Sequence, residues 1–232
     1  MVDSASAPTE GHVIHWAGYY DRLMLLLTVG QESGFRRRTI DAAGIRSGQR
    51  VLDVGCGTGT LALAAAEAVG SRGEVIGIDP SAEMIARARA KAATRGLPAR
   101  FELAAAERLP FDDGKFDVAL GSLMFHHLPQ PLQRAALLEL QRVLAPGGQL
   151  VLVDFVGRGP WLHRLLGRLL HRREGHGAHG GHDSHDSHGG HGHHGGLGHA
   201  AHLARELGYQ DVLVTPFRPR FLECLTARTP GG

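Results

Sequence analysis

The chain has 232 residues, with 25 Lys and Arg against 23 Asp and Glu, and a formal net charge of +2 when histidines are neutral. This length suits one domain with a single large core, and the charge balance gives no reason to expect a nucleic acid as partner. Cys56 and Cys224 are too few for a disulfide framework, which favours a cytoplasmic location. Residues 1–11 lack a signal-peptide pattern, and no apolar run approaches the roughly 20 residues of a membrane span.

Two helices are expected before the first strand. Residues 16–29 place apolar side chains, including Tyr19 and Tyr20, on one helical face. A second helix is expected near 35–43. The tyrosines are candidates either for the acceptor site or for ordinary packing.

The most informative stretch is an apolar run at 51–54 that leads into a glycine-rich turn and a helix at 60–69. The turn carries Gly55, Gly57 and Gly59 at alternate positions. A strand, a tight glycine turn and a helix allow the backbone to approach a nucleotide-like ligand closely. A second run at 74–78 ends at Asp79, where an acid is placed to bind ribose hydroxyls.

Two cofactors suit this spacing, a dinucleotide and S-adenosylmethionine. A dinucleotide site uses G-x-G-x-x-G, whereas this chain has Gly-x-Gly-x-Gly with Asp53 before it. An acid at this strand end repels a pyrophosphate and suits a cationic ligand, such as the amino group of a methionine moiety. The pattern therefore favours S-adenosylmethionine and disfavours the alternative of an NAD-dependent oxidoreductase.

Strands and helices alternate through the middle of the chain, which predicts an α/β fold with a parallel sheet covered on both faces. Further strands are expected at 99–104, 116–121 and 148–154, and further helices near 81–95 and 129–144. A helix at 200–208 and a hairpin of 211–215 with 220–226 are expected to end the fold.

Five segments together resemble the class I S-adenosylmethionine-dependent methyltransferases of the type 11-like group, and most of all the ubiquinone/menaquinone-biosynthesis branch. They are Val51–Thr60, Ile78–Ser81, Arg108–Phe111 with Lys115–Val118, and Arg142–Gly148. The resemblance runs from about 44 to 154 and resumes at the C-terminal end. It implies a Rossmann-like, mostly parallel sheet of seven strands whose last strand is antiparallel.

The resemblance also implies a cofactor site in which Asp53 and the glycine turn hold the methionine part and Asp79 binds the ribose. The residues expected to bind the cofactor are Asp53, Gly55, Cys56, Gly57, Gly59, Asp79, Pro80, Ser81, Ala106, Glu107 and Ser122. The family often has an Asp, which meets the adenine amino group, where this chain has Ala105. Backbone of Ala106 or the side chain of Glu107 is the candidate replacement, and a solvated Glu107 is the alternative.

Catalysis by this family does not require a dedicated catalytic residue, because the sulfonium already activates the methyl group for in-line displacement. If a base is needed, His126 and His127 are the nearest candidates, since they follow the fourth strand at the rim where ligands of such sheets lie. Asp154, at the end of the fifth strand, faces the same rim.

A histidine-rich tract interrupts the family pattern at residues 175–194. Imidazole is a usual ligand for Zn²⁺ or Ni²⁺, so the tract is a candidate metal site, with Asp183 and Asp186 as additional oxygen ligands. The candidate ligands are His176, His179, His182, His185, His188, His191, His193 and His194. The alternative is a low-complexity insertion that binds metal only incidentally.

Residues 161–173 predict an amphipathic helix, with leucines on one face and arginines opposite. We favour a lid over the acceptor pocket, and the alternative is peripheral contact with an anionic membrane. Both interpretations point to an apolar acceptor, such as a quinone precursor or a lipid.

The expected organisation is an N-terminal helical cap (1–46), a cofactor-binding core (47–158), a lid helix (159–174), the His/Gly-rich insertion (175–198), and a C-terminal helix and hairpin that complete the core (199–232). The function expected is methyl transfer from S-adenosylmethionine to a small molecule, with a hydrophobic one favoured. Tyr19, His126, Asp154 and residues 161–173 are expected to shape the acceptor site. The rival is a metal-binding or metal-sensing protein on a methyltransferase scaffold. The sequence leaves the acceptor atom and the oligomeric state open.

Overall fold

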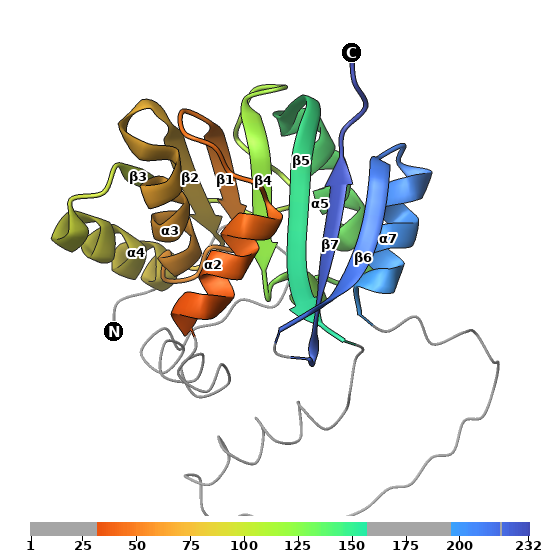
Figure 1. Cartoon of the computed structure of the whole chain (residues 1–232), viewed down its shortest axis with the longest axis horizontal. Helices are drawn as coiled ribbons and strands as arrows, with labels where there is room; N and C mark the ends of the chain where they lie inside the picture. Colours follow the sequence, from red (N-terminus) through yellow and green to blue (C-terminus); the bar gives the residue numbers. More distant parts are fainter. Residues whose placement is uncertain (1–31, 157–195, 219) are drawn as a thin grey trace, which may run out of the picture.

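The computed structural model describes residues 32–156, 196–218 and 220–232. Within them, the expected α/β architecture is confirmed as a seven-stranded sheet with helices on both faces (Figure 1). The strands are β1 (Arg50–Val54), β2 (Glu74–Asp79), β3 (Ala99–Leu103), β4 (Phe116–Ser122), β5 (Leu144–Phe155), β6 (Gln210–Phe217) and β7 (Leu222–Arg228). Their spatial order is β3-β2-β1-β4-β5-β7-β6.

The sheet is parallel from β3 to β5, and β7 pairs antiparallel with both β5 and β6. The expected antiparallel last strand is therefore confirmed. The carboxyl ends of β1, β2, β4 and β5 all lie at one edge, the lower one in Figure 1. Strand order reverses between β1 and β4, and ligands of open α/β sheets bind at such a point.

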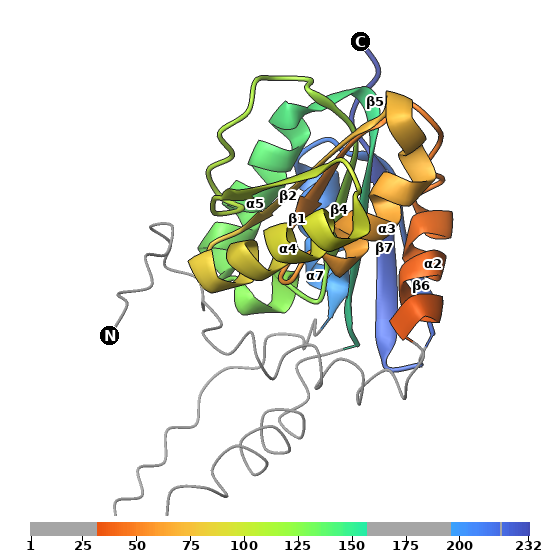
Figure 2. The same ribbon diagram turned by 90° about the vertical axis from the view of Figure 1, so that its left-hand side faces the viewer.

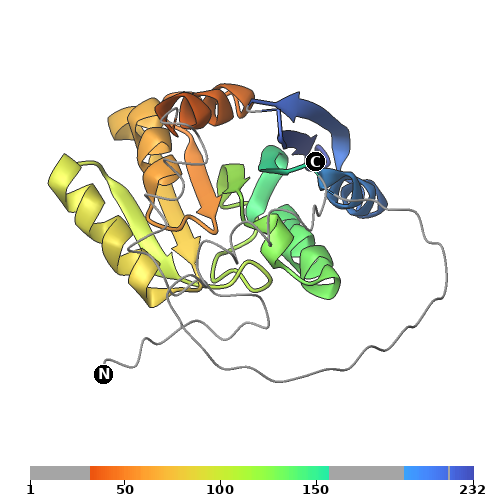
Figure 3. The same cartoon turned by 90° about the horizontal axis from the view of Figure 1, so that it is seen from below.

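Two helical layers enclose the sheet (Figures 2 and 3). Helices α2 (Glu32–Ala42), α3 (Thr60–Val69) and α4 (Ala82–Arg95) share one apolar core, whereas α5 (Gln130–Val143) and α7 (Leu197–Glu206) share the other. Alternate residues of the central strands serve the two cores: Val51 belongs to the first and Leu52 to the second. Burial on both faces explains why these strands read as continuous apolar runs.

The fifth strand starts earlier than the expected 148. Leu144 already pairs with Phe116, and the register then shifts before Val118 pairs with Gln149. Helix α5 ends at Val143, one residue inside the expected range. The Pro146–Gly148 segment thus forms an irregularity within β5, where Gly147 has a φ of 71°.

Several expected features lie outside the described residues: the helix at 16–29 with Tyr19, the helix at 161–173 and the histidine tract at 175–194. Of the helices in the described ranges, none has the length and apolar character needed to cross a membrane.

Candidate active site

The turn after β1 depends on three glycines in the left-handed region. Gly55, Gly57 and Gly59 have φ values of 64°, 53° and 79°. Residues with a Cβ adopt this conformation at a cost, which accounts for glycine at alternate positions. Gly59 is the N-cap residue of α3, and its N–H donates to the carbonyl of Cys56 at 2.9 Å. The turn therefore leads directly into the amino end of α3.

The same turn is tightly packed on its protein side. A Cβ added to Gly55 would lie 2.6 Å from the Cβ of Met124, and one added to Gly59 would lie 2.7 Å from the ring of Phe101 and 2.8 Å from Ala88. The absence of a side chain at Gly55 thus leaves room for Met124, which follows β4. Its absence at Gly59 leaves room for Phe101 of β3 and Ala88 of α4. Gly55 and Gly59 are therefore required by close approach as well as by φ.

Asp79 ties the second strand to this turn. Its Oδ2 accepts a hydrogen bond from Gly57 N at 2.9 Å, and its Oδ1 accepts one from Ser81 N at 2.9 Å. Burial raises the pKa of the Asp79 carboxyl, and these two backbone hydrogen bonds oppose the rise. The Ser81 hydroxyl is itself engaged as the N-cap of α4, where it accepts from Met84 N.

Asp53 is the most buried acid at this edge, with 1% of its surface exposed. Burial raises the pKa of its carboxyl to about 8, a hydrogen bond from the Ala62 backbone opposes the rise, and repulsion by Asp79 adds to it. Among the described residues, Oδ2 of Asp53 has no hydrogen-bond partner. A buried carboxylate oxygen without a partner is costly, so this site favours a positive or hydrogen-donating group.

Cys56 contributes its backbone rather than its thiol to this edge. The side chain is buried, burial raises its pKa well above the usual value, and Sγ lies 3.7 Å from the Gly57 carbonyl. Cys56 N donates to the Ile78 carbonyl at 2.8 Å, which holds the turn against β2. The thiol is therefore a packing group.

The loop after β3, which carries Ala106 and Glu107, starts beside Asp79. Ala104 N donates to the Asp79 carbonyl at 3.3 Å, so the loop starts beside that residue. Arg142 of α5 fixes its other end through the carbonyls of Leu109 (3.0 Å) and Phe111 (2.7 Å). Arg142 belongs to a motif recognised in the sequence, but nothing in the sequence signals this contact.

The acceptor edge is formed by the ends of β4 and β5. Ser122 ends β4 opposite Val153, and the short 3₁₀ helix η2 (Phe125–His127) follows. His126 Nδ1 lies 2.6 Å from Oδ1 of Asp154, and His126 N donates to Oδ2 at 2.9 Å. The structure thus joins two rim residues expected from the sequence, while His127 lies beside them with its ring centroid 3.9 Å from that of His126.

Leu123 is a site residue that the sequence does not reveal. It is buried and has a φ of 55°, a conformation that a residue with a bulky side chain rarely adopts. Its N–H donates to the Val153 carbonyl at 2.8 Å. This strained turn places Met124 against Gly55, so the acceptor edge and the glycine turn are in direct contact.

Residues 51–148, which include the glycine turn, Asp79 and His126, match the family described as methyltransferase domain. These residues are a class I methyltransferase domain. The chain is 44% identical over 136 residues to a demethylmenaquinone methyltransferase of Thermus thermophilus, covering 59% of this chain and 60% of the relative. It is 36% identical over 159 residues to a ubiquinone/menaquinone biosynthesis C-methyltransferase of Pseudomonas putida, covering 66% and 60%. The chain thus spans about 60% of the length of these relatives.

The fold of the methyltransferase domain recurs in solved structures. A SAM-dependent methyltransferase from Aquifex aeolicus superposes with a TM-score of 0.65 at 20% identity, covering 89% of this chain and 97% of that protein. At this identity the likeness concerns the fold alone.

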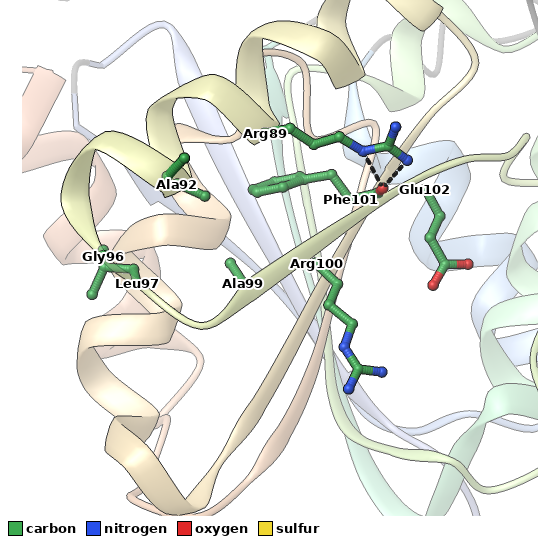
Figure 4. Close-up of a pocket in the computed structure, with 9 residues that line it drawn as sticks. Arg89, Ala92, Gly96, Leu97, Ala99, Arg100, Phe101 and Glu102 are labelled. Atoms are coloured by element: carbon green, nitrogen blue, oxygen red, sulfur yellow. Dashed lines mark hydrogen bonds between the residues drawn. The ribbon is translucent and has the colours of Figure 1, made fainter.

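A pocket of about 490 Å³ lies away from the glycine turn, between α4 and the edge strand β3 of the methyltransferase domain (Figure 4). Arg89 donates from Nε and Nη2 to the Phe101 carbonyl at 3.0 and 2.7 Å, which occupies its guanidinium within the fold. No group of three or more His, Cys, Asp or Glu side chains able to hold a metal occurs within 32–156, 196–218 or 220–232.

Proposed function

We propose that the chain is an S-adenosylmethionine-dependent methyltransferase acting on a small apolar molecule by in-line displacement. The observation that carries this proposal is the position of the glycine turn beside two buried carboxylates, Asp53 and Asp79, both with raised pKa. A pyrophosphate would place further negative charge beside these acids and would be repelled by them. S-adenosylmethionine brings a sulfonium and an ammonium, whose positive charges offset theirs.

The residues at this edge fit the cofactor. Asp53 has a buried oxygen without a partner within the described ranges, suited to the ammonium directly or through a water molecule. Asp79 uses one hydrogen bond on each carboxylate oxygen, which leaves acceptor capacity for ribose hydroxyls. Pro80, Ala106 and Glu107 would then lie beside the adenine. When bound, the cofactor supplies a methyl group already activated by the adjacent sulfonium.

A small apolar acceptor is supported by two independent observations. The relatives of Thermus thermophilus and Pseudomonas putida are named as methyltransferases of quinone biosynthesis. At the acceptor edge, the ring of Phe155 stacks with that of Phe221 at 6.2 Å and meets the His126 ring edge-on at 5.2 Å. These aromatic groups suit a flat apolar ligand, such as a quinone precursor.

The two unpaired cysteines support a cytoplasmic location.

Calorimetric titration with S-adenosylhomocysteine and S-adenosylmethionine tests the proposal. We expect Asp79→Ala to weaken binding about 30- to 100-fold, because the ribose loses a charged acceptor. Glu74→Ala is the matched control, since Glu74 lies at the opposite end of the same strand, and it should bind as the wild type does. Absence of binding by the wild type, with chelator and with added Zn²⁺ alike, would overturn the proposal. Binding only with Zn²⁺ would favour the metal-binding rival.

A further inference from the structure

The pair formed by His126 and Asp154 lies outside the set of residues assigned above to the cofactor. It joins two segments 28 residues apart in sequence, η2 and the end of β5. The Asp154 side chain is 4% exposed and that of His126 is 25% exposed. A buried acid therefore supports an imidazole that reaches the surface of the acceptor edge.

The contacts of Asp154 determine which nitrogen of His126 carries the proton. Asp154 Oδ2 accepts from His126 N at 2.9 Å, and Oδ1 accepts from Phe155 N at 2.8 Å. Both oxygens are thus acceptors, so the 2.6 Å contact to Nδ1 is a hydrogen bond donated by Nδ1–H. In the neutral ring Nε2 then holds the lone pair, and it has no hydrogen-bond partner among the described residues. An imidazole held in this tautomer is prepared to accept a proton.

The surrounding backbone places the start of η2 beside the glycine turn. Leu123, in the left-handed region, turns the chain after β4 and places Met124 against Gly55. His126 follows two residues later, and β4 lies next to β1, with Gly121 opposite Val54. Strained residues of this kind persist where the surrounding structure needs them, often at active sites.

We propose that His126 is the general base of the reaction and that Asp154 is its positioning residue. This inference rests on the proposed methyltransferase function. It restricts the acceptor to a molecule whose nucleophile carries an ionisable proton, such as a hydroxyl or a ring carbon activated by one.

The step balances with the groups named. The acceptor atom forms a bond to the methyl carbon while the carbon–sulfur bond breaks and leaves its electron pair on sulfur. The acceptor proton passes to His126 Nε2. Asp154 stabilises the resulting imidazolium through Nδ1–H, and the proton then leaves to solvent through the exposed side of the ring.

The first readout is independent of activity. ¹⁵N NMR of the full chain with labelled histidine, assigned with His126→Gln, should show that the neutral His126 ring carries its hydrogen on Nδ1. In Asp154→Asn the amide nitrogen should donate to Nδ1 and shift the hydrogen to Nε2. A wild-type His126 that carries hydrogen on Nε2 would overturn the proposal, because that ring could not accept the proton.

The second readout is turnover with 1,4-naphthohydroquinone and a series of phenols of graded acidity. We expect His126→Gln and Asp154→Asn to lower kcat about 10²- to 10⁴-fold with weakly acidic acceptors. The loss should shrink as the acceptor becomes acidic enough to be ionised before it binds. His202→Gln is the matched control, because His202 lies on α7, where it pairs with Glu206, and this variant should retain its turnover within a few-fold.

S-adenosylhomocysteine affinity separates this inference from the proposed function. Calorimetry should give the same affinity for wild type, His126→Gln and Asp154→Asn. If that affinity is retained but no hydroxyl acceptor is methylated, or His126→Gln turns over as the wild type does, the base assignment is overturned while the cofactor site stands. If the wild type binds no S-adenosylhomocysteine, the proposed function itself fails.

Discussion

The two halves of the candidate site are built in different ways. In the cofactor half, the turn after β1 is shaped by backbone conformation, with three glycines at positive φ within five residues. In the acceptor half, the geometry comes from side-chain contacts between distant segments, above all His126 with Asp154. The shape of the glycine turn therefore depends on the absence of side chains at three positions, whereas the acceptor half depends on the identity of a few side chains. Substitutions should accordingly act on stability in the first half and on specific contacts in the second.

The largest expected effect on stability is that of Gly59→Ala. The new Cβ would lie under 3 Å from Phe101 and Ala88. The φ of 79° would also strain the backbone of a residue that has a Cβ. We expect the free energy of unfolding in urea to fall by about 3 kcal/mol. Gly96→Ala is the matched control, since Gly96 has a φ of 63° but nothing within 4 Å of its added Cβ. It should lose only about 1 kcal/mol. Equal losses would show that packing around Gly59 is unimportant.

Asp53→Asn should have a smaller effect of opposite sign. The carboxyl has a pKa of about 8 in the folded chain against 3.8 ordinarily, so the folded state retains a proton that the unfolded state releases. Wild-type stability is therefore lost as pH rises from about 4 to about 8, and Asn removes this loss.

The linkage relation gives an upper limit of about 5 kcal/mol for this loss near pH 8, and we expect Asp53→Asn to recover about 2 kcal/mol of it, with little difference near pH 4. Thermal unfolding across this range measures the gap. S-adenosylhomocysteine affinity should fall at the same time, because the positive group of the ligand loses its charge partner. A stability difference between variant and wild type that does not change with pH would contradict the raised pKa of Asp53.

Gln133→Met tests the acceptor half with the smallest expected effect. The buried Gln133 side chain donates to the carbonyls of Phe125 and Leu128 at 3.4 and 2.9 Å, which anchors η2. Loss of both bonds should lower the free energy of unfolding by about 1–2 kcal/mol and leave S-adenosylhomocysteine affinity unchanged. Gln141→Met, which removes one bond to the Leu207 carbonyl, should cost less. A weakened cofactor affinity in Gln133→Met would show that the two halves are not separable.

The sequence predicts the cofactor half better than the acceptor half for a physical reason. Strand, glycine turn and helix are neighbours in the chain, so their pattern is local and the fold class follows from it, as the sheet confirms. The resemblance to a known family added the antiparallel strand. The sequence does not indicate the early start of β5 at Leu144, because this start depends on pairing with Phe116.

The acceptor half could be predicted only as a set of residue types at strand ends. The sequence predicts both His126 and Asp154 at the rim, but their hydrogen bond depends on the turn at Leu123, which no residue pattern signals. The sequence likewise gives no indication of the environment of Asp53. The sequence shows an acid at the end of β1, whereas the burial and raised pKa of this acid arise from α3 packing over it.

The insertion of β7 between β5 and β6 also bears on how the protein is made. Synthesis proceeds from the N-terminus, so β1 to β5 leave the ribosome well before Leu222–Arg228. Until β7 arrives, the outer edge of β5, which carries Asp154, has no pairing partner. During translation the cofactor half can therefore assemble before the acceptor half is complete, and an interruption of synthesis before residue 222 would leave an exposed strand edge prone to aggregation.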